Sequence, residues 1–160
     1  MNIAISSCLL GNKVRYDGKV KDYPELLELL KGHNLFPICP ETMGDLPTPR
    51  TPSERKNNKV INKDGIDVTN NYINGALKSL KIIEDNKCEL VILKEKSPSC
   101  GLNYIYDGSF TKTLINGNGV LYDYLKNKSV QCLNETQLDE IKKFIMWFYI
   151  LAGFHFTFWL

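Results

Sequence analysis

Short apolar runs alternate with segments of helical periodicity along this chain. Four runs have the length of buried strands, and they lie at residues 2–6, 34–39, 89–93 and 129–133. Between them, residues 24–31 and 69–86 carry apolar side chains three and four positions apart, which predicts helices that each bury one face. Strands alternating with helices predict an α/β fold, with a single domain and a mainly parallel sheet flanked by helices.

The helix ends carry their own signals. Pro24 suits a first helical turn and Gly32 follows as a stop, whereas Thr69 is expected to cap the helix that runs to about residue 86. A further helix is expected from residues 118–119 to about residue 127. Asn134, with a glutamine three residues later, resembles a capping box and predicts a last helix.

Three segments between these elements look different. Residues 42–58 hold several prolines and are expected to form a long ordered loop near a site. Residues 59–68 are expected to form a small hairpin whose turn is Asp64 and Gly65. Residues 102–110 are expected to be a loop.

Composition narrows the class of protein. A chain of 160 residues with 43% hydrophobic and 24% charged residues suits one folded domain, and no internal repeat is found. A net charge of +2 provides no field that would attract nucleic acid, so no nucleic-acid partner is expected. The amino terminus lacks a basic leader, which favours a cytoplasmic protein. Five cysteines in a reducing compartment favour metal binding or catalysis over disulfides.

Three of these cysteines follow predicted strands. Cys8, Cys39 and Cys100 would converge if the strands are parallel neighbours, because ligands bind beyond the carboxyl ends of such strands. Thiolates are soft ligands that favour zinc, copper(I) or iron-sulfur clusters, and three of them leave one position open. The alternative is that all three are small buried hydrophobic residues.

The remaining cysteines and the histidines fit other roles better. Cys88 precedes a strand and Cys132 lies inside one, so both are assigned to packing. His33 follows a helix stop and His155 lies in an apolar tail, so neither suits a missing zinc ligand.

Polar residues near the three cysteines are candidates for acid-base chemistry and binding. Glu41 could move protons or position a water, or it could be a solvated loop acid. The hydroxyls of Ser97 and Ser99 could hold a substrate, or they could simply make a serine turn. Two pairs of charged residues, Arg15 with Asp17 and Arg50 with Glu54, could form ion pairs or clamp a substrate. A structural ion pair is the favoured interpretation for most of these four residues.

The chain resembles domain-of-unknown-function family 523 (DUF523), which includes the thiouracil desulfurases. The matching segments lie, in family order, at residues 6–11 with 14–18, 39–41 with 46–50, and 97–101 with 106–110. The resemblance covers about residues 1–143 and includes the three cysteines at strand ends.

The resemblance implies a desulfurase that converts the thiocarbonyl of a small thiolated nucleobase, such as 2-thiouracil, into a carbonyl. It implies a 4Fe-4S cluster held by Cys8, Cys39 and Cys100, whose open iron takes the sulfur. Glu41 and Ser97 would then be catalytic. From their loop positions near the cysteines, Ser99, Arg15, Asp17 and Arg50 are the candidates for binding the substrate. The rival interpretations are a non-catalytic iron-sulfur or zinc sensor of redox or metal state, and a plain α/β binding domain with free cysteines.

The carboxyl end departs from the family pattern. Residues 144–160 contain no charged side chain and are dense in Phe and Trp, so they are set apart as a tail to the domain at 1–143. As a helix the tail would extend about 25 Å, the lower limit for crossing a bilayer. Packing on the domain, an oligomer contact and an altered reading frame are the alternatives, and membrane contact is the less favoured interpretation.

Overall fold

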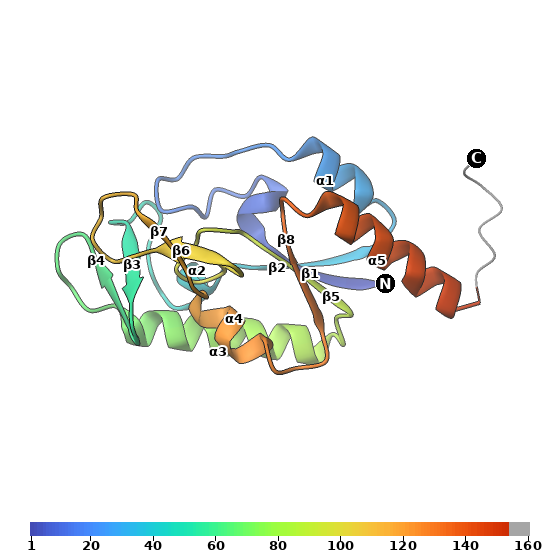
Figure 1. Ribbon diagram of the computed structural model, residues 1–160. Helices are drawn as coiled ribbons and strands as arrows, with labels where there is room; N and C mark the ends of the chain where they lie inside the picture. Colours follow the sequence, from blue (N-terminus) through green and yellow to red (C-terminus); the bar gives the residue numbers. More distant parts are fainter. Residues whose placement is uncertain (154–160) are drawn as a thin grey trace.

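A four-stranded parallel sheet forms the centre of the molecule (Figure 1). The computed structural model describes residues 1–153. The order of the strands across the sheet is β2-β1-β5-β8, and their bounds are β1 (Asn2–Ser6), β2 (Asn34–Ile38), β5 (Leu90–Leu93) and β8 (Gln131–Asn134). All neighbouring pairs are parallel, so the predicted α/β class and the positions of its four strands are confirmed.

Helices cover both faces of this sheet (Figure 1). The helices are α1 (Pro24–Leu29) and α5 (Leu138–Leu151) on one face, and α3 (Thr69–Asp85) and α4 (Val120–Leu125) on the other. Alternate residues of each strand point to opposite faces. Ile3 and Ile5 therefore pack with the α1 and α5 side, whereas Ala4 packs with α3 and α4, and all three are completely buried.

The smaller elements gather beyond the carboxyl ends of the strands. The 3-10 helix η1 (Ser7–Leu10) follows β1 directly, and α2 (Pro40–Met43) follows β2 after a single residue. Two antiparallel hairpins lie at the same end of the molecule, namely β3 (Ser53–Lys56) with β4 (Lys59–Asn62), and β6 (Tyr104–Tyr106) with β7 (Leu114–Asn116) (Figure 1). The chain thus builds a rim around the strand ends.

Two predictions for the segment after β2 are wrong. The stretch at 42–58 is not one irregular loop, because it holds the end of α2 and all of β3. The hairpin expected within 59–68 is displaced: β4 pairs with β3, and the turn around Asp64 and Gly65 adds only an isolated bridge between Ile61 and Asp67. Asn57 turns the hairpin at a φ of 55°, a left-handed conformation that asparagine tolerates.

The expected loop at 102–110 is also wrong in part, because it contains β6. Tyr104 of this strand is about half exposed, and its partner strand β7 is exposed throughout, so neither gives the alternation of apolar and polar residues that marks a strand. The two strands pair with each other, and Ile105 of β6 is their one buried side chain (5% exposed).

Both predicted helix caps differ from the structure. Thr69 is the first residue of α3 and makes no cap, because its hydroxyl accepts from the backbone N–H of Val60 (2.9 Å) and donates to Asp67 Oδ1. At the last helix, Gln137 Oε1 accepts from the backbone N–H of Asn134 (3.0 Å), as a capping box requires, but Asn134 Oδ1 accepts from Thr136 (2.9 Å). Helix α5 begins only at Leu138, so Asn134 is not its cap.

Helix α5 continues through the boundary expected between residues 143 and 144. Its last turns expose large apolar side chains to solvent, with exposed fractions of 56% for Trp147 and 63% for Ile150. Residues 154–160 of the expected tail lie outside the described residues. Within the described part, 1–153, no helix has both the length and the apolar character needed to cross a membrane.

Candidate active site

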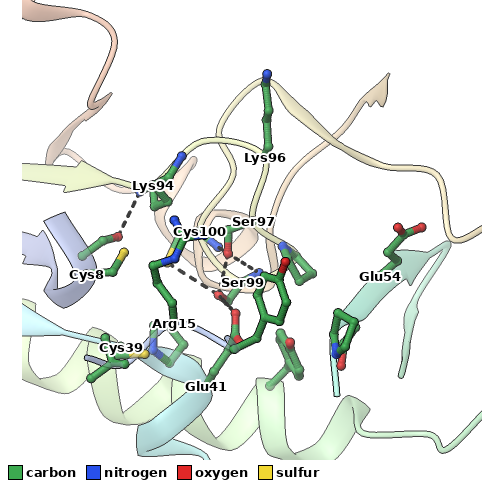
Figure 2. A pocket seen from close by; sticks show the side chains of 18 of the residues that line it. Cys8, Arg15, Cys39, Glu41, Glu54, Lys94, Lys96, Ser97, Ser99 and Cys100 are labelled. Carbon is green, nitrogen blue, oxygen red and sulfur yellow. Dashed lines mark hydrogen bonds between the residues drawn. The ribbon is translucent and has the colours of Figure 1, made fainter. Parts of the chain in front are cut away.

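Three cysteines from neighbouring strands line one cavity of about 500 Å³ at the carboxyl end of the sheet. Cys8 lies in η1 after β1, Cys39 directly precedes α2 after β2, and Cys100 ends the loop that follows β5. Because β2, β1 and β5 are adjacent and parallel, the fold brings these segments together, as the sequence predicted for neighbouring strands. In Figure 2, Cys8 and Cys39 lie on the side of the pocket nearest the sheet.

The three thiols also act on one another electrostatically. Burial raises the pKa of Cys8 to about 11, and the neighbouring Cys39 adds to this rise. Burial likewise raises the pKa of Cys100 to about 12, with further contributions from Cys39 and Cys8. Negative charge on all three sulfurs therefore requires compensation by positive charge, which a metal group supplies when thiolates bind it.

This donor set fits an iron-sulfur cluster. Soft thiolates are the usual ligands of such clusters, and each cysteine binds a different iron, so the sulfurs lie farther apart than the ligands of a single ion. Within residues 1–153, no three His, Cys, Asp or Glu side chains are placed to hold one metal ion. Cys8, Cys39 and Cys100 are the residues that could hold a cluster, and the cavity beside them leaves room for a small molecule.

Glu41 and two serines form a connected chain of hydrogen bonds on another wall of the cavity (Figure 2). Ser99 Oγ donates to Glu41 Oε1 (2.9 Å), and Ser97 Oγ lies 2.8 Å from Ser99 Oγ. Glu41 is in the first turn of α2, and its side chain is only 13% exposed. The alternative of a solvated loop acid therefore does not apply. Ser97 also makes the expected serine turn, because its Oγ accepts from the backbone N–H groups of Ser99 and Cys100 (both 3.2 Å).

Arg50 pairs with Glu41 and not with Glu54, so the sequence prediction for this pair is wrong. Arg50 Nη2 lies 2.6 Å from Glu41 Oε2, and Nε donates to the same oxygen (2.8 Å). Glu54 instead accepts from the backbone N–H groups of Gly108 and Phe110, both at 3.0 Å. Residue spacing favoured the near neighbour, whereas the actual partners are set by how α2 and the β6–β7 hairpin fold against the loop.

The other predicted pair forms as expected. Arg15 Nε lies 3.2 Å from Asp17 Oδ1, and this hydrogen bond lowers the pKa of Asp17. Arg15 lines the cavity, and Asp17 supports it from the following turn. All of the predicted site residues except Asp17 line the cavity. They are Cys8, Arg15, Cys39, Glu41, Arg50, Ser97, Ser99 and Cys100.

The sequence reasoning missed a charged network directly after β5. Lys94 lines the cavity, its Nζ pairs with Glu135, and its backbone N–H donates to Ser6 Oγ (3.0 Å). Burial works to lower the pKa of Lys94, but the Glu135 carboxylate outweighs it and the pKa is raised. This lysine is the first residue after the clearest apolar run, and that position at a strand exit was the signal that could have identified it.

Glu95 is a second residue that was missed. Its side chain is buried, and its Oε1 accepts from the backbone N–H groups of Leu102, Asn103 and Tyr104 at 3.0–3.1 Å. The carboxylate thus fixes the segment that follows Cys100. Nothing local in the sequence announces this role, because a glutamate in a polar loop is normally solvated.

Cys88 and Cys132 lie away from the cavity, as predicted. Cys88 is 8% exposed and belongs to the core beside α3 and α4, and Cys132 in β8 packs against the same core. His33 does not line the cavity either. Its Nδ1 lies 3.1 Å from the hydroxyl of Tyr149 in α5. The packing assignments for these residues are confirmed.

Comparisons with known proteins agree with the resemblance noted in the sequence. The profile of the 2-thiouracil desulfurase family matches residues 3–137. The uncharacterized protein YbbK of Bacillus subtilis (strain 168) is 35% identical, over 87% of this chain and 99% of YbbK. The solved structure of the 4Fe-4S-dependent thiouracil desulfidase TudS is also 35% identical, with a TM-score of 0.80 over 91% of this chain and 98% of TudS. The chain belongs to the 2-thiouracil desulfurase family.

Proposed function

We propose that this protein is a desulfidase that replaces the sulfur of a thiolated pyrimidine, such as 2-thiouracil, with oxygen. Membership of the family and the likeness to TudS support the class of reaction. The observation that carries the proposal is the convergence, in one cavity, of three thiols and a carboxylate joined to two serines. Soft ligands beside an acid-base group suit chemistry at a carbon-sulfur bond.

Cys8, Cys39 and Cys100 would hold a 4Fe-4S cluster. When bound, such a cluster offers one iron without a cysteine ligand as a Lewis acid that attracts the soft thiocarbonyl sulfur. Lys94 carries a positive charge on the same wall as Cys8 and acts on that thiol electrostatically. Its ammonium group would help the protein to balance negative charge on the thiolates.

Glu41 and Ser97 would perform the proton transfers and position the substrate. The carboxyl group of Glu41 accepts hydrogen bonds from Arg50 and Ser99, so its oxygens face donors on the cavity side. A water whose proton passes to these groups would attack the ring carbon of the substrate as the sulfur leaves. Carbon and sulfur keep their oxidation states, so no electron donor is needed.

The decisive experiment measures sulfide release from 2-thiouracil by anaerobically reconstituted protein. We expect turnover by the wild type, and we expect Glu41→Gln to lower kcat roughly 100-fold while iron and acid-labile sulfide contents stay unchanged. A brown, fully loaded protein that releases no sulfide from any thiolated nucleobase would favour the sensor interpretation. Lys78→Gln is the matched surface control, because Lys78 is exposed and lies outside the cavity.

A further inference from the structure

The hydrogen-bond polarity along the Ser97, Ser99 and Glu41 chain can be worked out from donor counts. Ser99 has one hydroxyl proton, and Glu41 Oε1 accepts it at 2.9 Å. The other acceptor within reach, Cys100 Sγ, is a weak one and lies 3.7 Å away. The oxygen of Ser99 is then left to accept, so the proton between the two serines at 2.8 Å belongs to Ser97.

The same polarity follows from the other end of the chain. Ser97 Oγ already accepts two backbone N–H groups, from Ser99 and Cys100, each at 3.2 Å. A hydroxyl oxygen has two lone pairs, so its remaining capacity is to donate. Protons therefore point in one direction, from Ser97 through Ser99 to Glu41.

Arg50 keeps Glu41 from turning away from this chain. Arg50 donates four hydrogen bonds: Nε to Glu41 Oε2 (2.8 Å), Nη1 to Pro47 O and Thr48 Oγ1 (both 3.1 Å), and Nη2 to Val14 O (2.8 Å). Its Nη2 also lies 2.6 Å from Glu41 Oε2. With Oε2 held in this way, Oε1 is left facing Ser99. Ser99 itself is 2% exposed, and its hydroxyl lies within 3 Å of both Ser97 Oγ and Glu41 Oε1.

We propose that Ser99 is a proton relay that links Ser97, at the cavity, to Glu41, and that it does not bind the substrate. This inference rests on the proposed desulfidase function. Negative charge that develops on Ser97 Oγ as its proton leaves is stabilised by the two backbone N–H groups that already point at this oxygen. Ser97 is thus the base that meets the substrate water, and Glu41 is the destination of the proton.

The protons and bonds balance along this route. As the water oxygen bonds to the ring carbon, the π electrons of the C=S bond move to sulfur. The water gives one proton to Ser97, Ser97 gives its own proton to Ser99, and Ser99 gives its proton to Glu41. The reverse transfer returns one proton to the sulfur as the carbon-sulfur bond breaks. The remaining hydroxyl proton goes to solvent, so thiocarbonyl and water give carbonyl, hydrosulfide and one proton, with no oxidant or reductant.

The test compares Ser99→Ala, Ser97→Ala and the double variant on the reconstituted enzyme with 2-thiouracil. We expect Ser99→Ala to lower kcat roughly 100-fold with KM changed by less than about threefold, because a relay acts on the chemical step. In the Ser99→Ala background, Ser97→Ala should cost much less than it does alone, since the route is already broken. Ser79→Ala is the matched control: Ser79 is fully buried in α3 and outside the cavity, and the acceptors of its hydroxyl are Gly75 O (2.8 Å) and Met43 Sδ (3.3 Å).

Three results would overturn the relay alone: an unchanged kcat for Ser99→Ala, a raised KM at unchanged kcat, or fully additive effects of the two serine substitutions. If Ser99→Ala loses its iron, the relay is tested on the wild type instead. Its single-turnover rate is measured in mixtures of light and heavy water. Several protons in flight give a curved dependence on deuterium fraction, and a linear dependence overturns the relay. A loaded wild type that releases no sulfide overturns the proposed function and the relay with it.

Discussion

Arg50 shows how one buried side chain can hold the parts of the site together. Its side chain is 6% exposed, and its guanidinium joins Glu41 to two loops, at Val14 and at residues 47–48. A planar group with five fixed donors suits this task, whereas a lysine ammonium offers three donors at one point. The geometry therefore favours a positioning role for Arg50 over the substrate contact that the sequence suggested.

Arg50→Lys should keep the charge next to Glu41 but lose most of the contacts to the loops. The acceptors at residues 47–48 can turn to water, but leaving the partly buried Val14 O without its donor costs about 1–3 kcal/mol. We therefore expect a loss of about 2 kcal/mol in the free energy of unfolding, measured with urea. Arg15→Lys is the control. The Arg15–Asp17 pair is more exposed (28% and 21%), and its change should stay below about 1 kcal/mol.

Turnover by Arg50→Lys distinguishes a role in positioning Glu41 from a role in binding the substrate. If Arg50 positions Glu41, kcat falls while KM for 2-thiouracil stays the same. A raised KM with an unchanged free energy of unfolding would show instead that Arg50 contacts the substrate.

At the scale of elements, the sequence predicted the strands and helices whose buried residues recur at regular spacing along the chain. β5 is buried at all four positions, and α3 buries one face, so apolar runs and helical spacing identified both. The hairpin β6–β7 buries only Ile105, and α2 is a single turn that starts at a proline. Such elements depend on contacts made after folding, which no local pattern records.

The same limit applies to the site. The cysteines could be predicted because each follows a strand, and the sheet brings strand ends together. The partners of Glu41 could not, because Ser99 is 58 positions away and Arg50 reaches Glu41 only through the turn of α2 and the loop after it. Pairing of side chains across such distances is decided by the packing of the rim.

Helix α5 is tied to the amino-terminal side of the sheet by an aromatic contact. The rings of His33 and Tyr149 stack with centroids 5.8 Å apart, and the Tyr149 hydroxyl lies 3.1 Å from His33 Nδ1. Burial, followed by the nearby N-terminal ammonium, lowers the pKa of His33 below its ordinary value of 6.5. The folded state therefore takes up a proton at this histidine less readily than the unfolded state does.

This difference predicts how stability depends on pH. The contribution of neutral His33 is fully present above pH 6.5 and is lost as the pH falls through the lower pKa of the folded state. His33→Phe keeps an aromatic ring beside Tyr149 but cannot titrate. Urea unfolding at pH 7 and pH 5 should therefore show that the wild type loses stability relative to His33→Phe. An identical loss in both proteins would contradict the assignment.

At the scale of the whole molecule, the candidate cluster ligands join three segments that are far apart in the sequence. Cys8 follows β1, Cys39 follows β2, and Cys100 follows β5 and the loop that Glu95 fixes. A group bound to all three would fasten the rim to the centre of the sheet. Since it would bind the folded chain and not the unfolded one, its binding energy would add to the stability of the fold.

Removal of the cluster should therefore lower the thermal stability of the whole domain and not of one loop. For a chain of this size we expect the anaerobically loaded protein to melt about 10 °C above the iron-free protein, measured by circular dichroism. Replacement of Cys8, Cys39 or Cys100 by alanine should abolish most of this difference and reduce iron content. Cys132→Ala should keep full iron content, because Cys132 lies in β8 and packs against the core. A Cys100→Ala protein that binds a full complement of iron and sulfide would rule out Cys100 as a ligand. Equal melting temperatures with and without iron would show that the protein alone holds the three segments together.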